Sequence, residues 1–176
     1  KLKLTYPHFF NKIHSLELDF SAHNAVPIIG IPMMLTTLFT PYSSRYDTIA
    51  AVDMNYKLLK APQSVEVEMA LIKNASKIHN YPYPPEIADI NGIASRYWNS
   101  DYPQHALAVY EFGIRLYPNY YEFHHALGEL YLPSDKEKSK WHLNKALKLL
   151  NTTEMEMSEK EAVFGEIMDM KIKNGL

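Results

Sequence analysis

A spacing of about 34 residues between equivalent large and small side chains most constrains how this chain can fold. Pro118 closes a first unit, in which the large and small positions are held by Ile90, Ala94, Tyr97, Ala106, Tyr110 and Gly113. The pattern returns one unit later, with one residue deleted near Pro133, at Leu127, Gly128, Tyr131, Leu143 and Ala146. Small residues let two antiparallel helices approach closely, and aromatic rings fill the gaps between them. The spacing therefore predicts two helical hairpins in tandem.

This spacing resembles that of tetratricopeptide (TPR) repeats, although Ile90 and Ala94 occupy positions where that repeat has tryptophan and glycine. The expected fold class is mainly α, with TPR-like hairpins preceded by a short α/β-hydrolase remnant of one or two strands and a helix. The hairpin helices are predicted near residues 86–99, 103–116, 120–132 and 136–150.

A last helix is predicted within residues 153–174, where it would close the exposed end of the hydrophobic stack. Ser158 and Glu161 have the spacing of a capping box at its start, and Gly175 lies just past its end.

Composition excludes several classes of function. The chain has 176 residues, a net charge of -2 and no cysteine, so a nucleic-acid footprint, disulfides and thiolate metal sites are not expected. It has no apolar run of the roughly 18 residues that a membrane span needs. Phosphate-binding glycine loops and HExxH-like motifs are absent, so no cofactor or metal is predicted. Thirteen tyrosines suit half-buried helix faces and binding grooves.

The amino-terminal segment has a different pattern. In residues 3–6 and 16–20, apolar and polar side chains alternate as they do in short strands. Two such strands do not form a stable sheet alone. We expect their sheet to belong to sequence that precedes this chain. His23 follows the second strand in a polar turn. A helix that is buried or covers a large hydrophobic surface is predicted from Pro32 to about Phe39. A histidine between such a strand and helix is where α/β-hydrolases place their general base, although a solvated turn histidine has the same spacing.

His23-Asn24-Ala25-Val26-Pro27 and the apolar helix after it resemble the end of the hydrolase domain in bacterial esterases of the esterase D / ferric-siderophore esterase type. Some of these proteins carry a helical, TPR-like extension, and residues 84–92 resemble the entry to one. The resemblance implies a carboxylic-ester hydrolase in which His23 is the base of the catalytic triad. The chain has no Gly-x-Ser-x-Gly motif, so the nucleophile is expected in an upstream hydrolase domain, and this chain alone is expected to be inactive.

The alternative is a non-catalytic TPR-like module for protein–protein interaction. In that case the inner faces of the hairpins would bind a peptide, another protein or a second copy, and the predicted groove residues are Asn91, Ser95, Trp98, His125 and Glu129. An ordinary solvated helix face has the same pattern. His125 and Glu129 have the spacing of a metal pair but lack a third ligand.

Three parts of the chain are expected. Residues 1–40 are the hydrolase remnant, residues 41–85 a linker and helix, and residues 86–176 the TPR-like domain. Within the second part, a short helix is predicted at 47–59 and an amphipathic helix from Ser64 to about His79. His124 is predicted to pack between helices, whereas His105 and His142 have no partner by spacing.

Overall fold

The computed structural model describes residues 31–32, 35–36, 39, 42, 44–78 and 81–176, and it divides into a unit that ends at Ser44 and a unit from Arg45 to Leu176. The predicted strands at 3–6 and 16–20 and the candidate base His23 lie outside these residues. In the first unit, the described positions of the predicted 32–39 helix are helical, and the Thr36 hydroxyl donates a hydrogen bond to the Pro32 carbonyl (2.8 Å). Leu35 and Phe39 are exposed, so the burial predicted for this helix is not found at its described positions.

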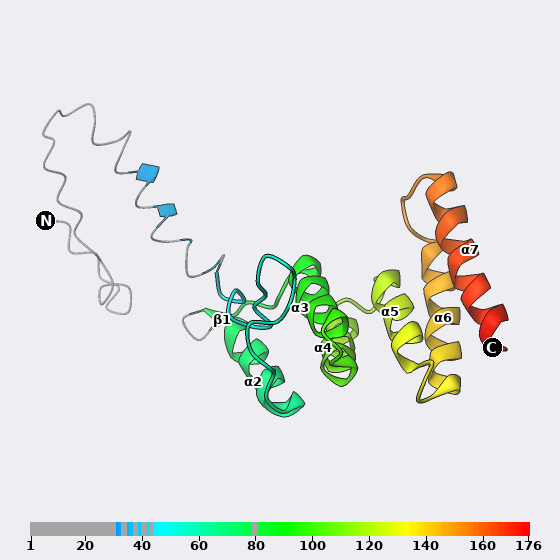
Figure 1. Cartoon of the computed structure of the whole chain (residues 1–176). Coiled ribbons are helices and arrows are strands. Elements are labelled where there is room, and N and C mark those ends of the chain that lie inside the picture. The colour runs from blue at the N-terminus through cyan, green and yellow to red at the C-terminus, as the bar shows by residue number, and fades with distance from the viewer. Residues whose placement is uncertain (1–30, 33–34, 37–38, 40–41, 43, 79–80) are drawn as a thin grey trace, which may run out of the picture. The chain divides into compact units, whose positions relative to one another are not determined.

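The second unit is mainly helical (Figure 1). Its described residues form six helices and one two-stranded antiparallel sheet: α2 (Val65–Ala75), β1 (Lys77–Ile78), β2 (Tyr81–Pro82), α3 (Ile87–Asn99), α4 (Pro103–Leu116), α5 (Tyr121–Tyr131), α6 (Lys136–Leu150) and α7 (Met157–Asn174). Helices α3 and α4 pack as one hairpin and α5 and α6 as the next, with α4 against α5. Helix α2 packs on α4, and α7 packs on α6.

The four predicted hairpin helices are confirmed, each to within one residue at either end, because local signals fix their boundaries. Pro103 occupies the first turn of α4, where its missing N–H is not needed. Glu86 and Asp89 form a capping box at the start of α3. The Asp135 carboxylate accepts a hydrogen bond from the Lys138 backbone N–H (3.0 Å) and caps α6.

Small residues occupy the points where helices approach most closely, as their spacing predicts. A Cβ on Gly128 would lie 2.5 Å from Cδ2 of Leu143, and one on Gly113 would lie 2.9 Å from the Phe123 ring. Ser139, which sequence analysis does not single out, is fully buried at the equivalent small position of α6, and its hydroxyl donates to the Gly128 carbonyl (2.6 Å). The other small residues at these contacts are fully buried: Ala94, Ala106 and Ala146.

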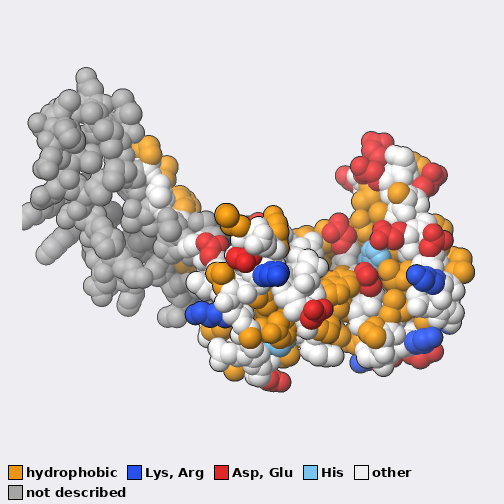
Figure 2. All heavy atoms as spheres, in the orientation of Figure 1, with side chains coloured by type: hydrophobic (Ala, Val, Ile, Leu, Met, Phe, Trp, Pro, Cys, Tyr) orange, Lys and Arg blue, Asp and Glu red, His pale blue; other side chains and the backbone are white. Residues whose placement is uncertain are grey.

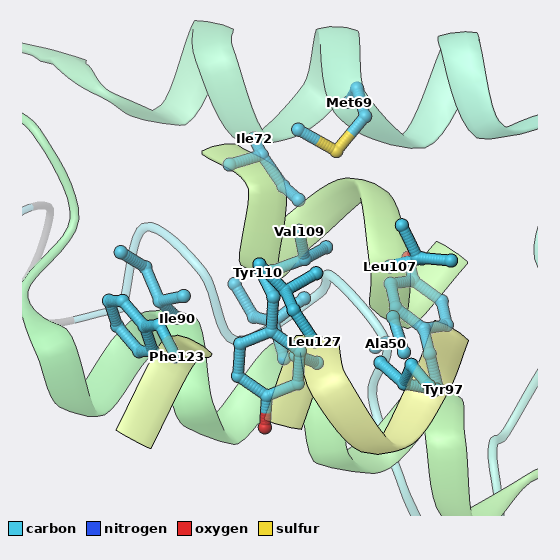
Figure 3. Close-up of a cluster of buried hydrophobic side chains, with 14 of the residues drawn as sticks. Ala50, Met69, Ile72, Ile90, Tyr97, Leu107, Val109, Tyr110, Phe123 and Leu127 are labelled. Atoms are coloured by element: carbon cyan, nitrogen blue, oxygen red, sulfur yellow. The ribbon is translucent and has the colours of Figure 1, made fainter. Parts of the chain in front are cut away.

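The main hydrophobic core joins α2 to the hairpin helices (Figure 3). Met69 and Ile72 of α2 lie over Val109 of α4, and Tyr110 lies deeper in the cluster with its hydroxyl pointing away from α2 (Figure 3). At the edge of this core the Tyr97 hydroxyl donates to Oε2 of the buried Glu68 (2.8 Å). This hydrogen bond ties α2 to α3, so α2 belongs to the same folded unit as the hairpins.

The helix predicted at 47–59 does not form. Ala50 and Tyr56 have positive φ angles of 49° and 58°, which a right-handed helix excludes. The Asp53 carboxylate accepts hydrogen bonds from the backbone N–H groups of Asn55 (2.8 Å) and Lys57 (3.0 Å) and stabilises a turn instead. The segment also packs into the core, where Ile49 and Ala50 are buried together with the preceding Tyr46.

Helix boundaries at the two ends of this unit differ in part from prediction. Ser64 caps α2 as expected, but the helix ends at Ala75 because β1 begins at Lys77. The capping box predicted at Ser158 is wrong, since α7 begins at Met157 and Ser158 lies inside it. Gly175 ends α7 in the left-handed conformation (φ 67°), as its position predicts.

Candidate functional site

An open cleft of about 310 Å³ lies between α3 and α5. The five predicted groove residues, Asn91, Ser95, Trp98, His125 and Glu129, all line it. Sequence analysis missed three further lining residues, Tyr110, Glu122 and Ala126. Glu122 and Ala126 could have been found, because they fall on the same face of α5 as His125. The structure therefore brings the predicted residues together in one place.

Helical periodicity explains how two helices supply both a core face and a cleft face. On α3, Asn91, Ser95 and Trp98 are four and then three residues apart and so share one face, while Ile90, Ile93, Ala94 and Tyr97 are buried on the other. On α5 the cleft residues recur with the same spacing, while Phe123 and Leu127 are fully buried. The two faces meet above Tyr110 of α4, which is the cleft residue that belongs to the core.

The polar groups of the cleft differ in the hydrogen bonds that they already make within the chain. The Ser95 hydroxyl donates to the Asn91 carbonyl (2.5 Å) within α3, so it faces the cleft mainly as an acceptor. Nε2 of His125 is buried and has no hydrogen-bond partner among the described residues. Trp98 is half-buried, with part of its ring packed on the core.

The cleft is acidic. Its lining includes the carboxylates of Glu122 and Glu129 and no lysine or arginine among the described residues. Burial, together with the charges of both carboxylates, raises the pKa of Tyr110 to about 12. Partial burial also raises the pKa of Glu129, and Glu166 of α7 adds to this effect, while His125 opposes it. Figure 2 shows acidic side chains gathered beside a histidine on the surface over α5.

A second group of polar residues lies inside the α5–α6 hairpin. Nδ1 of His124 lies 3.0 Å from Nδ1 of His142, both rings are buried, and Tyr131 stacks on His142 (centroids 5.6 Å apart, 17° between planes). Burial lowers the pKa of both histidines, that of His142 to about 4, so the pair is neutral at pH 7. His124 is thus a packing residue, as predicted, and His142 has a partner that its spacing in the sequence does not reveal.

His105 also has partners that its sequence spacing does not reveal. Its Nε2 lies 2.7 Å from the Gln63 carbonyl oxygen, and its ring packs near Tyr97 and Tyr102. These contacts are structural and lie away from the residues that line the cleft.

Within the described residues, no group of three or more histidine, aspartate or glutamate side chains is arranged to hold a metal ion. None of the helices found in that part of the chain has the length and apolar character needed to cross a bilayer. Comparison of the chain with protein-family models, with curated proteins and with solved structures finds no match. The cleft between α3 and α5 is therefore the candidate functional site.

Proposed function

We propose that residues 45–176 form a TPR-like interaction module that binds an extended peptide segment of a partner protein in the cleft between α3 and α5. One observation carries the proposal: side chains spaced along the first helices of two successive hairpins line a single open cleft. An exposed groove with aromatic and polar side chains at helical spacing is a common way to hold a peptide.

The size of the cleft favours part of a macromolecule over a whole small-molecule substrate. Its volume of 310 Å³ is at the lower end of the roughly 300–1,000 Å³ typical of small-molecule sites, and it is open to solvent. It also has no nucleophile with an adjacent base among its lining residues, since the Ser95 hydroxyl donates to a backbone carbonyl. A site of this kind suits one or two anchoring side chains of a longer ligand.

Replacing Trp98 by alanine is expected to weaken peptide binding by about 30-fold, because a tryptophan at the centre of a binding site often contributes about 2 kcal/mol. The ligands would be heptapeptides selected from a displayed random library on the immobilised 176-residue chain, and affinity would be measured by fluorescence anisotropy. Trp141 provides a matched control, since it is the other tryptophan of the chain, is 58% exposed and does not line the cleft. Trp141→Ala should bind the same peptides with unchanged affinity.

A second variant separates loss of binding from loss of folding, because Trp98 also packs on the core. Ala126→Tyr adds a ring to the cleft from α5 and keeps the Cβ atom of Ala126, which packs at the edge of the core. It should retain the circular dichroism spectrum and melting temperature of the original chain but bind the selected peptides at least about tenfold more weakly. Peptides that bind both variants as tightly as the original chain would refute the proposed function.

A second candidate concerns the amino-terminal segment, where the resemblance around His23 favours an esterase. In this proposal the helical module is the carboxyl-terminal part of a carboxylic-ester hydrolase and recognises its substrate or a partner, while His23 acts as the base of a serine triad. A fluorophosphonate probe should label a protein in which an upstream hydrolase domain precedes this sequence, and His23→Ala should abolish that labelling. The 176-residue chain alone should stay unlabelled. Absence of labelling in the longer protein would remove this candidate.

A further inference from the structure

The two carboxylates of the cleft come from one face of α5. Glu122 lies in the first turn of the helix and Glu129 two turns later, so they line opposite ends of the same surface. Both line the cleft together with Tyr110 of α4, and the charge of each raises the pKa of the Tyr110 hydroxyl. Glu166 of α7 adds a third negative charge close enough to raise the pKa of Glu129.

No basic side chain of the described residues compensates these charges. The salt bridges found in this part of the chain join Arg45 to Asp89 and Lys138 to Asp135, and neither involves a cleft carboxylate. Within the cleft, His125 opposes the effect of Glu166 and lowers the pKa of Glu129. Like charges held near each other in a partly desolvated cleft repel, and a bound cation relieves that repulsion.

Trp98 adds a second element of recognition. Its indole ring lines the cleft opposite the carboxylates of α5, and an indole is the aromatic ring that attracts cations most strongly. A guanidinium group can stack on an aromatic face while its N–H groups bind carboxylates, whereas the ammonium group of lysine has no planar face to stack. The chemistry of the cleft therefore favours arginine over lysine.

We propose that the cleft recognises its peptide by an arginine side chain, whose guanidinium group is held by Glu122 and Glu129 and stacks on Trp98. This proposal rests on the peptide-binding function proposed above and specifies the class of ligand. The cleft accepts this one side chain, and the flanking residues of the peptide lie along the exposed face of α3 and α5.

The test uses the same random heptapeptide library, panned on the complete chain and counter-selected on Trp98→Ala. Recovered peptides should share an arginine. In a synthetic copy of one such peptide, citrulline at that position should weaken binding by about tenfold or more, because it keeps the shape of arginine and removes its charge. Glu122→Gln and Glu129→Gln should each weaken binding of the arginine peptide by about tenfold and leave the citrulline peptide unaffected.

Glu137→Gln is the matched control, since Glu137 is an exposed carboxylate of α6 that does not line the cleft. It should bind the arginine peptide with unchanged affinity. If the recovered peptides depend on Trp98 but carry no arginine, or bind both glutamine variants as tightly as they bind the original chain, the arginine proposal is wrong while the peptide-binding function stands. If no recovered peptide depends on Trp98, both proposals fail.

Discussion

Replacing Gly128 by alanine is expected to lower the free energy of unfolding by about 2 kcal/mol. Overpacking destabilises the folded state by more than the better helix propensity of alanine stabilises it. The added methyl group would lie 2.5 Å from Cδ2 and 2.6 Å from Cγ of Leu143, with the Leu143 backbone nitrogen at 3.3 Å. Leu143 is fully buried and cannot move aside without disturbing its neighbours. The α5–α6 hairpin must open, and urea unfolding followed by circular dichroism should show the loss.

Gly165 offers a control with the opposite sign. It lies in α7, and a Cβ at that position meets nothing within 4 Å. Gly165→Ala should therefore raise the free energy of unfolding by up to about 1 kcal/mol, because alanine is the better helix former. If both alanine variants are stabilised equally, the close approach of α5 and α6 at Gly128 is not present in solution.

Acid is expected to destabilise the α5–α6 hairpin before the carboxylates titrate fully. Burial lowers the pKa of His142 from 6.5 to about 4, so the unfolded chain binds this proton more readily than the folded chain. The contribution of the neutral His142 ring to the free energy of unfolding is fully present above pH 6.5 and is lost as the pH falls towards 4. The linkage relation gives a loss of about 2–3 kcal/mol from His142, and the lowered pKa of His124 adds to it.

The measurement is the free energy of unfolding of the chain between pH 4 and pH 7.5, compared with that of His142→Asn. The variant is less stable at neutral pH because a buried ring is lost, but its stability should fall less steeply over this interval. Only the difference between the two slopes reports on His142, since other groups titrate in both proteins. Equal slopes would show that His142 is accessible to protons in the folded state.

The hairpins could be predicted from the sequence because their signals are local. Proline and capping residues mark where α3, α4 and α6 begin, and the small residues that recur about 34 positions apart are those that the folded structure buries at helix contacts. The groove face was predicted from the resemblance to TPR proteins, in which this face of the first helices points into the groove. Five of the eight cleft residues were identified in this way.

What sequence analysis missed depends on contacts between distant parts of the chain. Tyr110 was assigned to the core by its spacing, and only the meeting of α3 and α5 above it makes it part of the cleft. The His124–His142 contact joins two helices across 18 positions, which no pattern along a single helix reveals. The segment at 47–59 was predicted as a helix although the spacing of its apolar residues is irregular. The positive φ angle of Ala50 excludes a helix there, and the carbonyl groups of Ile49 and Ala50 accept hydrogen bonds from Arg96 of α3.

The hydrogen bond between Tyr97 and Glu68 limits where the polypeptide can be truncated without exposing its core. A polypeptide that starts at Pro85 keeps every residue of the cleft but loses the carboxylate that receives the Tyr97 hydroxyl, together with Met69 and Ile72. Val109 and Tyr97 would then face water, and such a truncated version would tend to self-associate through this bare surface. The shortest segment that keeps its own interior begins before Tyr46, so a domain boundary set by the repeat alone would be about 40 residues too late.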